Sequence, residues 1–146
     1  MTSRRKFIQQ TTAGAAALTI PFNVPAKTFR PMTDPGALVL STWNFGLKAN
    51  EEAWKVLKAD GRALDAVCAG VKIPEADPKV TSVGYGGLPD RDGRVTLDSC
   101  VMDEFGNAGS VCAIEHIMHP SSVARLVMEK TPHVILVGEG ALQFAI

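Results

Sequence analysis

The stretch VTLDSCVMDEFGNAGSVCAI, residues 95–114, decides the fold class. Residues 95–102 predict a β-strand, and residues 108–114 predict a second one. The residues between them, Glu-Phe-Gly-Asn at 104–107, have the composition of a tight turn. The whole stretch therefore predicts a β-hairpin.

The segments around this hairpin predict helices. Asn50 is expected to cap one helix, and Gly61 to end it. Apolar residues recur at helical spacing over residues 64–71, before Pro74. Another helix is expected from Pro120 to residue 128, since apolar side chains recur there too.

Two short apolar runs predict further strands, at residues 37–41 and 133–137. A last helix is expected to begin at Gly140, and the sequence ends inside it at an apolar residue, Ile146. Because domains seldom end in this way, we expect the chain to be one part of a longer protein. The elements together predict a mixed fold of the α+β class.

Composition agrees with one soluble globular domain. The chain has 146 residues, of which 46% are hydrophobic and 21% are charged. No uninterrupted apolar run reaches the roughly 18 residues of a membrane span. The formal net charge is zero, so nothing points to nucleic acid or to an anionic membrane as a partner.

The first 26 residues predict an export signal. Ser3-Arg4-Arg5-Lys6-Phe7-Ile8 resembles the twin-arginine pattern, a weakly apolar stretch follows, and Val24-Pro25-Ala26 is a small-residue cleavage site. We therefore expect a twin-arginine signal peptide at 1–26, a linker at 27–36 and a domain at 37–146. The product is expected in the periplasm or outside the cell. A frayed basic N-terminus is the alternative.

The three cysteines, Cys68, Cys100 and Cys112, do not predict a disulfide framework. The count is odd, and a twin-arginine substrate folds before it meets an oxidising compartment. Cys112 with His116 is the only nucleophile–base pair close in sequence, but nothing near it would orient the imidazole.

Other polar patterns favour structural roles. Glu115-His116-Ile117-Met118-His119 lacks the spacing of a zinc-protease helix, so no metal site is expected. Asp90 and Asp92 are expected in a turn rather than in a calcium loop. Asp98 and Asp103 could be paired acids, but acids at strand ends more often accept backbone hydrogen bonds.

The glycine-rich run Gly84-Tyr85-Gly86-Gly87 is not followed by the helix that a phosphate loop needs. It predicts a place where the backbone needs positive φ or approaches a neighbour closely. Such a neighbour could belong to an active centre.

Six segments in the same order resemble the N-terminal half of the glycosylasparaginases. They are STWNFG at 41–46, ALDAV at 63–67, SVGYGGLPD at 82–90, VTLD at 95–98, MD at 102–103 and TPHVILVG at 131–138. Plant-type asparaginases and isoaspartyl peptidases share some of these segments. They begin with a His-Gly-Gly-Ala-Gly loop, however, where this chain has STWNFG.

The resemblance implies an N-terminal-nucleophile hydrolase with a four-layer αββα sandwich, of which this chain holds the first half. Such precursors cut themselves before a threonine, whose hydroxyl attacks the asparagine side-chain amide that carries N-acetylglucosamine. The threonine's own amino group serves as the base. No metal or organic cofactor is implied. The expected partners are the C-terminal half, the small amide substrate and, once complete, further copies of the enzyme.

Only three positions of the site carry over from the family. Trp43 and Phe45 match the aromatic loop beside the substrate, and Ser82 matches a serine that supports the amino group of the nucleophile. The family's His-Asp-Thr junction is absent from the sequence, so no catalytic residue is assigned here and the chain alone is expected to be inactive. Core packing is the alternative role for Trp43, and capping of a turn is the alternative for Ser82.

Two further functions stay open. The first is an isoaspartyl peptidase or L-asparaginase of the same superfamily. The second is an exported binding domain without catalysis. A His-Asp-Thr junction downstream in the gene would support an amidohydrolase, and a stop codon after Ile146 would support the binding domain.

The twin arginines give the first testable prediction. Replacing both with lysine (Arg4→Lys, Arg5→Lys) should hold a reporter fused to the signal in the cytoplasm, because the transport route reads the arginine pair. Cell fractionation measures the outcome. Unchanged export of the double variant would exclude this route.

Overall fold

A computed structural model describes residues 36–146 of the chain. Its centre is a three-stranded sheet in the order β1 (Leu97–Met102), β2 (Ala108–Ile114), β3 (Ile135–Val137). β1 and β2 are antiparallel, and β3 runs parallel to β2. The predicted hairpin is therefore confirmed, and so is a strand within 133–137.

The hairpin turn is closed by its own first residue. Asp103 accepts hydrogen bonds from the backbone amides of Phe105 and Asn107 at 2.9 and 2.8 Å. The Asn107 side chain also donates to this carboxylate and is the main cause of its pKa lying below the ordinary value. Asp103 thus serves the turn, as an acid at a strand end was expected to do.

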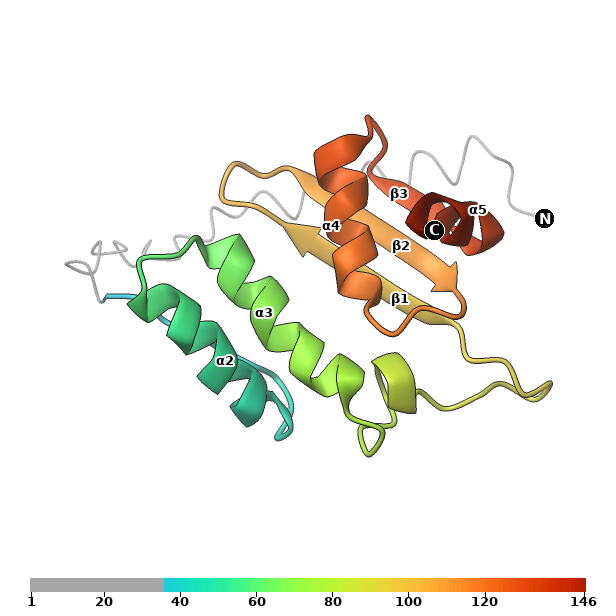
Figure 1. Ribbon diagram of the computed structural model, residues 1–146, viewed down its shortest axis with the longest axis horizontal. Helices are drawn as coiled ribbons and strands as arrows, with labels where there is room; N and C mark the ends of the chain where they lie inside the picture. Colours follow the sequence, from blue (N-terminus) through green and yellow to red (C-terminus); the bar gives the residue numbers. More distant parts are fainter. Residues whose placement is uncertain (1–35) are drawn as a thin grey trace, which may run out of the picture. The chain divides into compact units, whose positions relative to one another are not determined.

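Four α-helices accompany the sheet in the described residues (Figure 1). They are α2 (Gly46–Lys58), α3 (Ala63–Ala76), α4 (Pro120–Lys130) and α5 (Gly138–Ala145), with a short 3-10 turn, η1, at Gly84–Gly86. α2 and α3 lie side by side as an antiparallel pair, and α4 crosses the sheet. In residues 36–146 no helix has both the length and the apolar character that a membrane crossing requires.

One face of the sheet is covered by helices. Val111 and Ile114 of β2 pack against Val127 of α4, and all three are buried. The contact is close because β2 has Gly109 under the helix: a Cβ there would lie 2.3 Å from the carbonyl oxygen of Ala124. The backbone of α4 therefore rests directly on β2. Side chains of α3 and α5 complete this core.

The opposite face of the sheet has no cover in the described residues. Cys100 pairs with Ser110 and Ser110 with Ile135, so these three residues form one row across the sheet. The apolar members of this face are exposed: Met102 is 67%, Ile135 50% and Val137 57% accessible to solvent. We call the side chains of Met102, Cys100, Ser110, Cys112, Ile135 and Val137 the bare sheet face.

The prediction of a strand at 37–41 is wrong for this structure. The segment has no regular structure, and its leucines are exposed, Leu38 at 72% and Leu40 at 81%. A β-strand needs hydrogen bonds from a neighbouring strand, and this segment pairs with none of the three strands of the described residues.

Asn50 does not cap a helix, contrary to expectation. α2 begins four residues earlier at Gly46, because a turn closed by the Gly46 amide on the Trp43 carbonyl already leads into it. Asn50 instead accepts a hydrogen bond from the Ser41 hydroxyl. α3 also continues past Pro74 to Ala76, because a proline removes one hydrogen bond without stopping the last turn.

The fold class is thus a mixed α/β arrangement with helices on one face of a small sheet. The helices expected between Asn50 and Gly61, over 64–71, from Pro120 and from Gly140 are present as α2, α3, α4 and α5, although α2 begins earlier than expected. The signal at 1–26 and all but the last residue of the linker at 27–36 lie outside the described residues.

The two faces of the sheet can be told apart by matched lysine substitutions in the 146-residue chain. Ile135→Lys, on the bare sheet face, should change the free energy of unfolding by no more than about 0.5 kcal/mol and reduce self-association. Val111→Lys, under α4, should cost more than about 4 kcal/mol because it buries an unpaired charge. Urea unfolding followed by circular dichroism and sedimentation velocity measure both. Equal losses from the two variants would contradict the one-sided core.

Candidate functional site

A cavity of about 490 Å³ brings together the three residues that the sequence singled out. Trp43 and Phe45 reach it from the turn before α2, and Ser82 from the loop after α3. Trp43 is 68% exposed, so it is not part of the core formed by the described residues. The aromatic side chains and the serine hydroxyl therefore line one solvent-accessible space, although about 40 residues separate them in sequence.

The loop that carries Ser82 is held by its backbone. The amide of Leu88 donates to the Thr81 carbonyl, and that of Gly87 donates to the Gly84 carbonyl, both at 3.1 Å. Gly84 has φ +56°, and a Cβ there would lie 2.1 Å from the carbonyl oxygen of Glu75. The close approach predicted for the glycine-rich run is confirmed: its neighbour is the last turn of α3, at the wall of the cavity.

A buried carboxylate forms part of the same wall. Glu75 is only 5% exposed, and it accepts hydrogen bonds from the Ser121 amide at 3.1 Å and from the Ser121 hydroxyl at 2.9 Å. His119 Nδ1 lies 3.1 Å from Glu75 Oε2. Glu75 and Ser121 both line the cavity, so its wall is polar where α3 meets the start of α4.

Asp98, from β1, is a second acid in the lining. Its Oδ1 accepts the backbone amide of Ala113 at 2.7 Å, and Ala113 has φ +50°, which is unusual for a residue with a side chain. Asp98 thus supports a strained point in β2. It serves the backbone, which is the role expected for an acid at a strand end.

The thiol of Cys112 is not a promising nucleophile. The neighbouring carboxylate of Asp98 is the main cause that raises the pKa of the Cys112 thiol above its ordinary value. A raised thiol pKa lowers the fraction of reactive thiolate at neutral pH. His116, its neighbour in sequence, lies instead beside Glu115, with Nε2 3.8 Å from Oε2.

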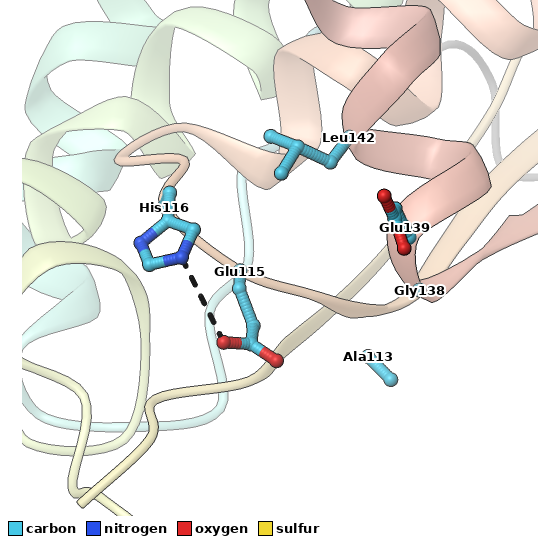
Figure 2. Close-up of a pocket in the computed structure, with 6 residues that line it drawn as sticks. All are labelled: Ala113, Glu115, His116, Gly138, Glu139 and Leu142. Atoms are coloured by element: carbon cyan, nitrogen blue, oxygen red, sulfur yellow. Dashed lines mark ion pairs between the residues drawn. The ribbon is translucent and has the colours of Figure 1, made fainter.

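His116 and His119, the two histidines considered for a metal site, contact different acidic residues. His116 lines a second, smaller cavity of about 220 Å³ with Glu115 and Glu139 (Figure 2). His119 is held at Glu75. Among residues 36–146, no three side chains of the metal-binding types are grouped closely enough to hold an ion.

The turn at residues 90–93 also has the expected structural role. Asp90 Oδ1 accepts the amides of Asp92 and Arg94 at 2.8 and 2.9 Å. The bond from Arg94 is the main cause of the lowered pKa of Asp90. The carboxylate is occupied by its own turn.

Glu75 was not predicted as a residue of the site, since it follows Pro74, beyond the helix expected over residues 64–71. A signal was present, because Glu75 follows Leu64, Cys68 and Val71 at the spacing of one helix face. A carboxylate on the buried face of a helix needs partners, and Ser121 supplies two hydrogen bonds. Nothing in the sequence indicated that Ser121 would be the partner.

The sequence is similar to a known protein family and to several curated proteins. A family model described as asparaginase matches residues 37–146. An N(4)-(β-N-acetylglucosaminyl)-L-asparaginase of Elizabethkingia miricola is 59% identical over 99% of this chain and 43% of its own length. The rat protein of the same name is 41% identical over 78% of this chain and 33% of its own length.

A second kind of relative matches less of the chain. An isoaspartyl peptidase of Salmonella typhimurium is 48% identical over 65% of this chain and 30% of its own length. The chain therefore spans less than half the length of these curated relatives.

Proposed function

This chain belongs to the asparaginase family, and on that premise we propose that it is the N-terminal part of an amidohydrolase that cleaves the bond between N-acetylglucosamine and asparagine. The observation that carries the proposal is the cavity shared by Trp43, Phe45 and Ser82. These are the three positions that the resemblance to glycosylasparaginases assigned to the substrate and the nucleophile. The identity of 59% to the Elizabethkingia protein supports the same activity.

The cavity suits a small polar substrate with an apolar side. The indole of Trp43 and the ring of Phe45 offer flat apolar surfaces, which exclude water from one side of a bound molecule. The lining also contains Ser82 and Ser99 and the acids Glu75 and Asp98, whose polar atoms can take part in hydrogen bonds. A hydroxyl-rich amino-acid conjugate matches this mixture.

The nucleophile of this proposal lies outside the chain. The relatives are more than twice as long, and the resemblance assigns the reacting threonine to their C-terminal part. In the proposed reaction a precursor cuts itself before that threonine. The freed amino group then takes the proton of the threonine hydroxyl as it attacks the amide carbonyl. Ser82 would hold this amino group in place.

The bare sheet face supports the finer architecture. In a four-layer αββα sandwich, two sheets pack face to face between outer helices. Here the helices cover one face of the sheet, and the other face carries exposed apolar side chains of β1 and β3. We infer that a second sheet, contributed by the C-terminal part, covers that face.

An isoaspartyl peptidase activity is the second candidate, since the Salmonella relative has that name. It is less favoured because that similarity covers 65% of the chain, compared with 99% for the Elizabethkingia relative. We also propose export through the twin-arginine route, on the pattern at residues 3–8.

The test uses a complete protein: residues 1–146 joined to the part of the Elizabethkingia protein that follows the matched region. This chimera should cut itself into two chains and hydrolyse glycosylasparagine faster than a β-aspartyl dipeptide. Preference for the dipeptide would favour the second candidate. No hydrolysis of either substrate by a self-cleaved chimera would refute the proposed function.

Trp43→Ala in the chimera should lower kcat/KM for glycosylasparagine by about ten- to a hundred-fold, or about 1–3 kcal/mol, because a wall of the cavity is lost. Self-cleavage should be less affected, because the nucleophile lies elsewhere. Trp54→Ala is the matched control: this residue, in α2, does not line the cavity, and its substitution should leave kcat/KM nearly unchanged.

Thermal unfolding separates a local effect from a loss of folding. Normal melting and normal hydrolysis of Trp43→Ala would show that the role carried over from the family is wrong at this position. A large drop in melting temperature with equal loss of both activities would instead make Trp43 a core residue of the complete protein.

A further inference from the structure

We propose that Glu75 is a positioning residue for the site: its carboxylate fixes the start of α4, and its backbone fixes the loop that carries Ser82. The proposal rests on the proposed function only for its kinetic consequences. Its structural basis is the single point at which α3, α4 and the Ser82 loop meet.

The side chain of Glu75 completes the N-terminus of α4. The first residue of that helix is Pro120, which has no amide hydrogen, and its N-cap residue, His119, makes no capping hydrogen bond with its side chain. The amide of Ser121 would be left without a partner in a buried place, but it donates to Glu75 Oε1 at 3.1 Å. A carboxylate at this end of a helix is also favoured by the helix dipole.

The same carboxylate receives two further groups. The Ser121 hydroxyl donates to Glu75 Oε2 at 2.9 Å, and His119 Nδ1 lies 3.1 Å from the same oxygen. An ionised carboxylate can accept from the amide, from the hydroxyl and from His119 when Nδ1 carries a hydrogen. A glutamine has nearly the same shape but no charge, so it loses the charge-assisted part of these bonds and the favourable interaction with the N-terminus of α4.

The backbone of Glu75 supports the other side of the junction. Gly84 is so close to it that a Cβ on Gly84 would lie 2.1 Å from the Glu75 carbonyl oxygen and 2.3 Å from the Glu75 Cα. Ser82 is only two residues before this contact, and both residues line the cavity. A shift of Glu75 therefore moves Gly84, and with it the Ser82 hydroxyl.

Glu75 affects the nucleophile only by positioning Ser82. This makes a specific kinetic test possible. In the self-cleaved chimera, Glu75→Gln should lower kcat about tenfold and change KM by less than about twofold. When Ser82→Ala is already present, Glu75→Gln should have almost no further effect on kcat, because the group it positions is gone. Full additivity of the two substitutions would overturn the proposal.

Two variants control the experiment. Glu104→Gln removes an exposed carboxylate that pairs with Arg62 at 3.1 Å, and it should leave kcat unchanged. Ser121→Ala removes only the hydroxyl donor and keeps the backbone bond, so it should lower kcat less than Glu75→Gln does. If Glu75→Gln does not fold, the cycle is run with Ser121→Ala and Ser82→Ala, and additivity of that pair would overturn the proposal in the same way.

Hydrogen exchange separates this inference from the proposed function. If the parent chimera does not hydrolyse the amide substrate, the proposed function fails. Hydrogen exchange in the 146-residue chain still tests whether Glu75 holds the Ser82 loop. Glu75→Gln should speed exchange of the Leu88 amide, which closes the Ser82 loop on Thr81, by at least about tenfold. Unchanged exchange at Leu88 would overturn the claim that Glu75 holds this loop.

Discussion

The organisation of the described residues depends on one constraint: the sheet buries only one of its two faces. Gly109 lets the backbone of α4 rest on β2, so Val111, Ile114 and Val127 form a dry core between them. The opposite face keeps its apolar side chains in solvent. An exposed apolar surface of this kind marks a place of contact, since burying it would stabilise the protein by about 25 cal/mol per Å².

The cavity follows from how the helices meet at this core. α3 packs against the edge of the covered face, and its last turn carries Glu75 to the start of α4. Gly84 then brings the Ser82 loop onto the Glu75 backbone. The contacts of Glu75 with α4 and with Gly84 thus set the position of the proposed substrate site. Trp43 and Phe45, from the turn before α2, complete the lining of the cavity.

Sequence patterns predicted the hairpin, the four helices except for the start of α2, and the role of each turn acid, because these depend on neighbours in the chain. Asp90 and Asp103 accept amides within four residues of themselves. The run at 37–41 was predicted wrongly because a strand depends on a partner strand, which its own residues do not encode. The bonds between Glu75 and Ser121 join residues 46 positions apart, so only the fold brings them together.

Cysteine labelling measures directly whether the rest of the protein covers the bare sheet face. Ile135→Cys places a thiol on that face, and Lys130→Cys, at the end of α4, serves as an exposed reference. Iodoacetamide labelling is followed by peptide mass spectrometry. If the face is covered in this way, the thiol at position 135 reacts readily in the 146-residue chain and at least about tenfold more slowly in the chimera, and position 130 is equally reactive in both. Equal labelling of position 135 in the two proteins would contradict the account.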